Sequence, residues 1–338
     1  MIINNNTPYQ AESTLDKDGD LNSMIVVVIK ATFQFNAQGQ VNLAAKQIPV
    51  YLCDEMIDSY PIGSVRFESD MAPFKPKGDL LILGHACPPD GSATSLEVGF
   101  RCRDMEKVLA VFGDRKWEAG GFMGGIQASQ PEPFEELELT FGRSFGGIDM
   151  VYGAICAANQ AGMGMISKKA KKEEIIEKPL PNIENPNHLI RSWKDHPIPV
   201  GMGHVSKGSS ERVGFLGTYD EAWHKDRKPD RPIDFDFQFF NSAPKDQQLD
   251  GFFQGGELIE LLNLTPGTAQ VQFTLPEIKV NATLKRRDVE QKEPFPLNLD
   301  TVCVMTKDMT FTLTWRGWLP VYDPLMQDVE MITIESSQ

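Results

Sequence analysis

The stretch from Met309 to Trp315 reads MTFTLTW, in which large apolar side chains alternate with threonines. Successive side chains of a β-strand point to opposite faces, so this alternation predicts a strand with one buried face. The same period of two recurs over residues 96–103, 271–275 and 278–285. Residues 25–35 begin with an unbroken apolar run, IVVVI, which is typical of a strand buried on both faces. Together these patterns predict a fold dominated by strands.

Helical patterns are scarce by comparison. Residues 149–158 are apolar, but Gly153 interrupts them, and residues 258–264 fit a short helix and a strand equally well. The chain contains 28 glycines and 23 prolines among its 338 residues, a modest excess that favours turns over long helices. We therefore predict a mainly β fold with a minor α+β component: antiparallel β-sandwich-like sheets, a few short helices and long loops.

The composition changes between residues 167 and 211. A lysine cluster there is followed by glutamates and then by several prolines. Few apolar residues are spaced to form an element, which predicts a long surface connection. The expected domains are therefore a β-rich domain at 1–166, the connection at 167–211 and a second β-rich domain at 212–338. A single extended β unit is the alternative.

The overall charge and the cysteines exclude some classes of protein. Lys and Arg number 33 and Asp and Glu 47, so the formal net charge of −14 disfavours nucleic-acid binding. The five cysteines are irregularly spaced, which fits a reducing compartment better than a disulfide framework. The start of the chain does not resemble a signal peptide, and no apolar run approaches the ~20 residues of a membrane span. We expect a cytoplasmic protein without membrane insertion.

The sequence lacks the common cofactor, metal and nucleophile motifs. No G-x-G-x-x-G, P-loop, H-E-x-x-H or G-x-S-x-G pattern occurs. Asp16, Asp18 and Asp20 surround a glycine, but the glycine and glutamate positions of an EF-hand are not matched, so a polar turn is expected. We predict no cofactor, no metal site and no catalytic residues.

One carboxylate pair keeps an enzymatic alternative open. Asp234 and Asp236 would share one face of a strand, about 6.6–7 Å apart, inside the range of roughly 5–9.5 Å between glycosidase carboxyl groups. A hydrolase using this pair is therefore the alternative function. The structural interpretation is that both carboxylates face solvent or hold a neighbouring loop, while Phe235 and Phe237 fill the core.

The segment 217–248 has the highest local density of aromatic and polar residues. Its Asp, Asn and Pro residues are typical of turns that bond their own backbone. Tyr219 and Trp223 are residue types that anchor protein interfaces when they lie on loops. An irregular loop packed on the core and a partner-binding loop both remain open.

With these residues in view, the chain resembles a family of uncharacterised-domain proteins encoded in type VI secretion loci. The resemblance is carried by the order of short stretches over some 250 residues: 28–33, 72–79, 113–117, 143–147, 159–164, 180–184, 217–248, 255–257 and 275–276. Two stretches depart from the family pattern. The usual Asn-Pro is Asn159-Gln160, and an expected tryptophan and arginine are reduced to SSER at 209–212.

The resemblance implies a cytoplasmic adaptor or chaperone that binds a PAAR-like effector and helps to load it onto the VgrG spike. The partners implied are that effector and, as an optional second partner, VgrG. A permanent structural component of the secretion apparatus is a further alternative. The matching motifs supply the candidate partner-binding residues, which are Arg115, Trp117, Phe145, Asn159, Tyr219, Asp220, Trp223, Asp234, Asp236, Phe239 and Asn241.

Overall fold

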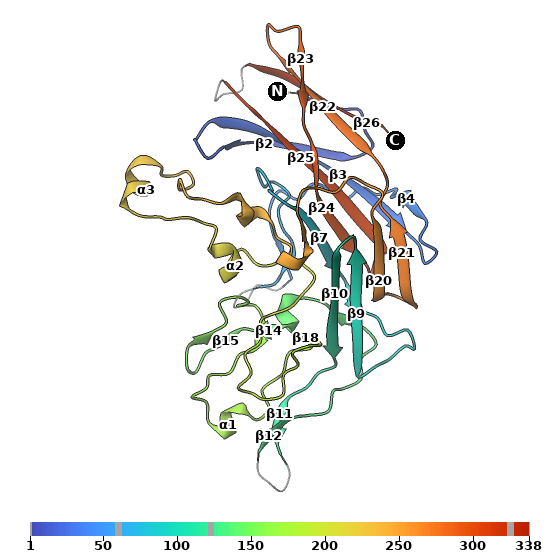
Figure 1. The fold of residues 1–338 in the computed structure, drawn as a ribbon, viewed down its shortest axis with the longest axis vertical. Coiled ribbons are helices and arrows are strands. Elements are labelled where there is room, and N and C mark those ends of the chain that lie inside the picture. Colours follow the sequence, from blue (N-terminus) through green and yellow to red (C-terminus); the bar gives the residue numbers. More distant parts are fainter. Residues whose placement is uncertain (1, 58–62, 121–124, 323–327, 338) are drawn as a thin grey trace.

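The computed structural model describes residues 2–57, 63–120, 125–322 and 328–337. The prediction of a mainly β fold is confirmed, because strands far outnumber helical residues in the described chain and the longest of them form three multi-stranded sheets (Figure 1). The central sheet has seven strands: β19 (Gln248–Leu249), β7 (Gly78–Leu83), β24 (Asn298–Met305), β25 (Thr310–Pro320), β3 (Ser23–Phe35), β2 (Gln10–Lys17) and β4 (Val41–Leu43), the last pairing with β3.

Two further sheets complete the framework. The five-stranded sheet runs in the order β18 (Ile183–Glu184), β10 (Met105–Phe112), β9 (Ser95–Cys102), β20 (Leu258–Thr265) and β21 (Thr268–Thr274). The four-stranded sheet runs β1 (Ile2–Asn5), β26 (Val329–Ser337), β22 (Lys279–Arg286) and β23 (Lys292–Phe295). Most pairs are antiparallel, as predicted, but β7 pairs with β24 and β1 with β26 in parallel, which the sequence did not indicate.

Shorter elements occupy the remainder of the described chain. Two-stranded ladders join β5 (Glu55–Met56) to β6 (Val65–Phe67), β8 (His85–Ala86) to β13 (Leu137–Glu138), β11 (Trp117–Ala119) to β12 (Ile126–Ala128), β14 (Phe145–Gly146) to β17 (Met163–Gly164), and β15 (Ile148–Asp149) to β16 (Ala154–Ile155). The helices are α1 (Lys172–Ile175), α2 (Ser210–Val213) and α3 (Glu221–Asp226), with 3-10 turns η1 (Phe141–Arg143), η2 (Phe237–Phe240) and η3 (Lys245–Gln247).

The main hydrophobic core is shared by the three sheets. Alternate side chains of β3 and β25 enter it from the central sheet, as the two-residue period predicted. Phe35 stacks on Phe273 of β21 at a centroid distance of 4.3 Å, and Phe273 stacks on Phe311 of β25 at 5.0 Å. Aromatic stacking therefore ties the five-stranded sheet to the central one.

The opposite face of the central sheet is also buried, and it combines small apolar clusters with paired charges. Lys30 Nζ lies 2.7 Å from Asp70 Oδ2, and Arg316 Nε lies 2.6 Å from Asp300 Oδ2, with all four side chains largely shielded from solvent. Buried charges are tolerated where they are paired in this way. The segment after β6 covers part of this face, because Asp70 pairs with Lys30 and the carbonyls of Asp70 and Ala72 accept from Arg316.

The predicted boundaries at 1–166, 167–211 and 212–338 do not separate the sheets. Strand β25 lies between β3 and β24, and β9 pairs with β20, so strands from both sides of the connection form common ladders. The connection itself is not a loose surface segment: Ile175, Leu180 and Ile190 are buried in a second core with Trp117. Residues 258–264 form a strand, and residues 149–158 form a hairpin rather than a helix.

Candidate functional site

A projecting loop gathers several of the predicted binding residues. This loop, residues 214–235 and called the arm here, carries α3 and extends away from the sheets at the left of Figure 1. Asp220 begins α3 as its N-cap, accepting a hydrogen bond from the backbone N–H of Trp223 at 2.9 Å. The helix has only six residues, so its stability comes from the contacts of the loop around it.

The two ends of the arm are held together. Asp234 accepts hydrogen bonds from the backbone N–H and the hydroxyl of Thr218 at 2.9 and 2.7 Å, and these bonds lower the pKa of the Asp234 carboxyl below its usual value. Gly217 has φ of 76°, and a Cβ there would lie 2.6 Å from Asp234 Oδ1, so only glycine fits this closure. Within the loop, Trp223 Nε1 donates to the carbonyl of Asp230 at 2.7 Å.

The arm is also fastened to the end of β2 and to the turn after it, where Arg227 donates to the carbonyl of Gly19. Arg231 donates to the carboxylate of Asp16 and to the backbone carbonyl of Lys17. Lys17 Nζ in turn lies 2.7 Å from Asp230 Oδ2. The Arg231 guanidinium faces an aromatic cluster at the base of the arm, made of Phe235, Phe237 and Phe240. The arm is therefore a closed loop with a defined base.

Apolar side chains are exposed on this arm and beside it. Tyr219 packs edge-on against Trp223 at 4.7 Å yet is 50% exposed, and Ile233 is 83% exposed. The hairpin of β15 and β16 and helix α2 lie along the same side of Figure 1 and add further exposed apolar groups. We call this set the apolar edge: Met150, Val151, Ile155, Val213, Tyr219 and Ile233.

Five of the predicted binding residues lie inside the molecule instead. Trp117 and Phe145 belong to the second core. Asn159 donates to the carbonyls of Phe141 and Phe145 at 2.7 and 3.0 Å. In this conformation these three side chains, and those of Arg115 and Asn241, hold the fold together and present little surface to a partner.

Arg115 and Asn241 each hold a buried carboxylate. Arg115 Nη2 donates to Glu184 Oε1 at 2.5 Å, and Asn241 Nδ2 donates to Asp79 Oδ1 at 2.9 Å. Phe239 is half-buried, and its backbone carbonyl accepts from the guanidinium of Arg212. Several of the motifs that carried the resemblance therefore supply buried side chains that stabilise the fold.

The expected strand through Asp234 and Asp236 is wrong. Asp234 lies in a bend at the base of the arm, and Asp236 is the N-cap of η2, where it accepts from the backbone N–H of Gln238 at 2.8 Å. Pro232 and the capping side chains favour turns over a strand here. Both carboxylates hold local backbone, and the lowered pKa of Asp234 is the opposite of what a general acid requires. Phe235 and Phe237 form the aromatic cluster at the base of the arm rather than entering the main core.

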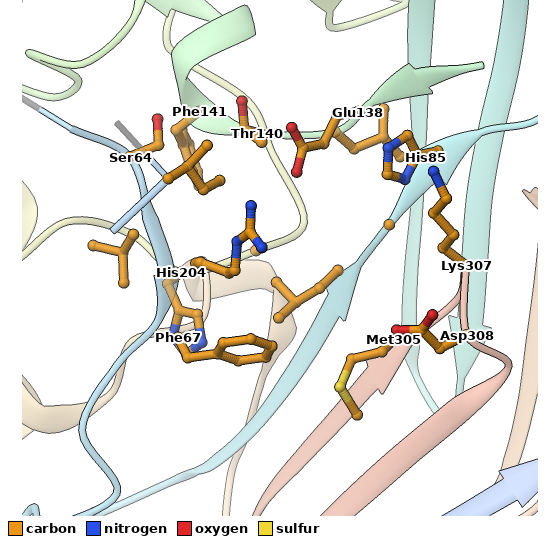
Figure 2. A pocket seen from close by; sticks show the side chains of 17 residues that line it. Ser64, Phe67, His85, Glu138, Thr140, Phe141, His204, Met305, Lys307 and Asp308 are labelled. Atoms are coloured by element: carbon orange, nitrogen blue, oxygen red, sulfur yellow. The ribbon is translucent and has the colours of Figure 1, made fainter. Parts of the chain in front are cut away.

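A cleft of about 430 Å³ opens on another part of the surface, beside the polar face of the central sheet. Figure 2 places Ser64 and Phe141 on one side of it and Glu138, His85 and Lys307 on the other. Burial lowers the pKa of His85, and the nearby Lys307 ammonium lowers it further, so this imidazole is neutral at pH 7. Sequence patterns did not point to the cleft, because its walls come from separate segments of the chain.

The floor of the cleft requires a glycine. A Cβ on Gly84 would lie 1.9 Å from the hydroxyl oxygen of Thr306, which follows β24. The two strands beneath are in register, with Leu83 opposite Met305, and both of these side chains line the cleft. The central sheet thus fixes one wall of the cleft rigidly.

Neither a metal-binding cluster nor a membrane-spanning helix is found in the described ranges of the chain. No group of three or more His, Cys, Asp or Glu side chains there is placed to share a metal ion. None of the helices in those same ranges has the length and apolar character to span a bilayer. Asp18 accepts hydrogen bonds from the backbone N–H groups of Asp20 and Asn22, which confirms the polar turn predicted for this stretch.

Comparison with known proteins gives one result. No curated protein and no solved structure matches the chain. A family model described as an uncharacterized protein conserved in bacteria, DUF2169, matches residues 20–316, which covers all three sheets in part, the arm and the cleft. Because that match spans most of the 338 residues, the chain belongs to the DUF2169 family of bacterial proteins.

Proposed function

We propose that this protein is an adaptor that binds another protein through the arm and the neighbouring apolar edge. The observation that carries the proposal is the exposure of Tyr219 and Ile233 on a loop that is closed at its base and fastened to the β2–β3 turn. Binding residues placed on loops over a rigid scaffold are a common solution for recognition. Exposed apolar groups gathered on one side of a molecule are typical of an interaction surface.

In its specific form, the proposal assigns a cytoplasmic role in type VI secretion. The cargo would be a PAAR-like effector, which the adaptor would hold and pass to the VgrG spike. This form rests on the resemblance described above, whose strongest stretch, 217–248, includes the arm. The net charge of −14 would suit a basic cargo, because an acidic surface attracts a basic protein and speeds their association.

Tagged co-purification from the native host, at endogenous expression and low salt, tests the proposal. Recovery of a PAAR-like effector, with or without VgrG, would support the specific form, whereas recovery with an assembled spike and no effector would favour a permanent structural role. Recovery of the protein alone would count against binding of any stable partner. Assays for hydrolase activity would then be the next experiment.

A double variant tests the surface. Tyr219→Ala combined with Ile233→Ala should weaken capture of the co-purified partner at least tenfold, because aromatic and large aliphatic anchors carry much of the energy of an interface. The matched control is Tyr322→Ala with Ile198→Ala, which removes two exposed side chains of the same kinds from outside the apolar edge. Equal capture by both double variants would contradict the proposed surface.

A further inference from the structure

One long strand at the edge of the central sheet has no neighbour on its outer side (Figure 1). Strand β2 pairs with β3 over residues 10–17 without a break in register, and no other strand in the described ranges pairs with it. The same ladder continues at Asp18, whose backbone N–H donates to the carbonyl of Asn22. Even-numbered residues of β2 therefore direct their backbone groups towards β3, and the outward-directed residues are Ala11, Ser13, Leu15 and Lys17.

Most of these outward backbone groups have no partner. Those of Ala11 and Ser13, and the N–H of Leu15, make no hydrogen bond among the described residues. The carbonyl of Lys17, in contrast, accepts from Arg231, so the arm closes this end of the edge. No residue of β2 is fully buried, and the Leu15 side chain is 41% exposed. A row of free donors and acceptors is thus accessible along β2.

The other edges of the three large sheets are short or protected, as is usual for edges that must not pair. Strands β1, β4, β18, β19 and β23 have four residues or fewer, and β23 contains Pro294. Strand β21 has seven residues, but Gly39 lies against it, so close that a Cβ there would be 2.2 Å from the Gln272 carbonyl oxygen. Strand β2 has eight residues, no proline and no bulge, which makes it the edge best suited to accept another strand.

A second copy of β2 fits this edge. Two copies related by a two-fold axis pair antiparallel, and outward residues must then face outward residues. If the axis passes through Ser13, Ala11 of each copy lies opposite Leu15 of the other, and Glu12 lies opposite Thr14. The three outward pairs give about six hydrogen bonds between the copies, two for each pair.

Charge selects this register over its neighbours. A shift of two residues in one direction places Glu12 opposite Glu12, and a shift in the other direction places it opposite Asp16. Like charges that are directly opposed destabilise an antiparallel pair. Larger shifts shorten the ladder. With the axis at Ser13, Asp16 lies opposite Gln10 instead, and no two like charges are directly opposed.

The pairing also covers apolar surface. Ala11 and Leu15 lie opposite Ile29 and Ile25 of β3, so both side chains are on the face of the sheet that carries the main core. Ala11 packs against that core, whereas Leu15 is partly exposed beside it. In the paired arrangement, each exposed Leu15 contacts Ala11 of the other copy, which extends the apolar face of one sheet into the next.

We propose that two copies of this protein form a symmetric dimer by pairing their β2 strands antiparallel about Ser13, which joins the two central sheets into one. The dimer does not depend on the adaptor role. The net charge of −14 on each copy opposes association, as do the two Glu12 side chains, which lie diagonally across the axis. The dimer should therefore tighten when added salt screens this repulsion.

Sedimentation equilibrium of the full chain, at physiological and at raised salt, tests the proposal through a mass twice that of one chain. Ser13→Pro should raise the dissociation constant of the dimer at least about tenfold, because it removes an outward N–H at the axis. The ladder with β3 stays intact, since its bonds come from even-numbered residues. Ser13→Ala is the matched control and should dimerise as the wild type does.

Two further sets of variants test the register. Thr14→Lys should tighten the dimer, because it places an ammonium group opposite Glu12, and Thr14→Glu should weaken it. In a Cys53→Ser background, Ser13→Cys should form a disulfide-linked dimer with a mild thiol oxidant, because residues paired at the axis have Cα atoms about 5.5 Å apart. Leu15→Cys in the same background is the control and should not cross-link, since its opposite residue is Ala11.

Three results would overturn the proposal. One is a wild-type protein that stays monomeric at both salt concentrations, including the case in which Ser13→Pro abolishes capture of the co-purified partner, since the edge would then accept a strand of another protein. Another is a Ser13→Pro variant that melts at the wild-type temperature and dimerises as tightly. The last is cross-linking of Leu15→Cys as fast as Ser13→Cys. The arm variant Tyr219→Ala with Ile233→Ala should dimerise normally, which separates this proposal from the adaptor role.

Discussion

Arg212 and Glu68 form a two-fold hydrogen-bonded ion pair inside the molecule, with Nη1 to Oε2 at 2.6 Å and Nη2 to Oε1 at 2.7 Å. The pair joins α2, at the end of the proline-rich connection, to the segment that follows β6. Arg212 also donates to the carbonyls of Val205 and Phe239, so its guanidinium is fully used. The ion pair explains why the connection is held against the sheets.

Replacing this arginine should be costly. Arg212→Ala leaves Glu68 buried without its main partner, and we expect a loss of about 3 kcal/mol in the free energy of unfolding, at the lower end for a broken buried pair. The loss is limited because Lys207 Nζ lies 3.7 Å from the same carboxylate. Urea denaturation of the wild type and of Arg212→Ala measures this loss in the free energy of unfolding. The control is Arg101→Ala, which breaks exposed pairs with Glu106 and Glu260 and should cost far less, because solvent screens them. Similar losses in the two variants would contradict the assignment.

Asn159 provides a second test, because the sequence marked it as a candidate binding residue and the structure buries it. Asn159→Ala removes the donors of the Phe141 and Phe145 carbonyls. We expect the free energy of unfolding to fall by about 2 kcal/mol, since the Phe145 carbonyl loses its buried donor and the Phe141 carbonyl keeps only the N–H of Ser144. The exposed Asn42, which has no comparable bonds, is the control, and Asn42→Ala should change stability by less than about 0.5 kcal/mol. A variant of Asn159 with wild-type stability and weakened partner capture would instead favour a binding role.

The sequence alone located the strands that have one apolar face and one polar face. Alternation located β9, β22 and β25, because one face of each is apolar while the other carries polar side chains. It could not assign residues 258–264, where the apolar side chains fit both a helix and a strand and the pairing with β9 and β21 decides. The order of strands in the sheets could not be predicted either, since strands far apart in the sequence, such as β3 and β25, are neighbours in the sheet.

The candidate site was predicted in part. The dense segment 217–248 did include the arm, and Tyr219 is exposed there. The tryptophan and glycine motifs at 113–117 and 143–147 instead build the second core, because a distinctive residue can be needed for packing as well as for binding. The cleft could not be predicted, since the segments that line it, from residues near 64, 84, 139, 204 and 306, come together only in the folded chain.

The cysteines allow a direct check of burial. All five are free, and burial raises the pKa of the Cys102 and Cys303 thiols to about 12, which keeps them protonated and unreactive. Cys53 alone is exposed. In the native protein a thiol reagent should therefore label Cys53 rapidly, and Cys53→Ser should remove that fast phase. Labelling in urea should reach all five thiols. Persistence of the fast phase in Cys53→Ser would contradict this, and would mean that the half-buried Cys156 or one of the three buried thiols reacts as fast.

The stability of the protein should depend on pH through His204. Burial lowers the pKa of this histidine from its usual 6.5 to about 4, and its Nδ1 lies 2.9 Å from the hydroxyl of Ser242. The charged groups nearest to it are Glu68, Lys75, Asp79 and Arg212, whose opposing effects on its pKa are smaller than that of burial.

Between pH 6.5 and 4, the unfolded chain binds a proton at this position and the folded chain does not. The contribution of neutral His204 to the free energy of unfolding is therefore fully present above pH 6.5. It falls by up to about 3 kcal/mol as the pH approaches 4. Urea denaturation across this range should give a steeper decline for the wild type than for His204→Asn, which cannot take up the proton. The exposed His188 is the control, and His188→Asn should follow the wild-type curve. Parallel curves for the wild type and His204→Asn would mean that other groups, such as the buried carboxylates, account for the acid sensitivity.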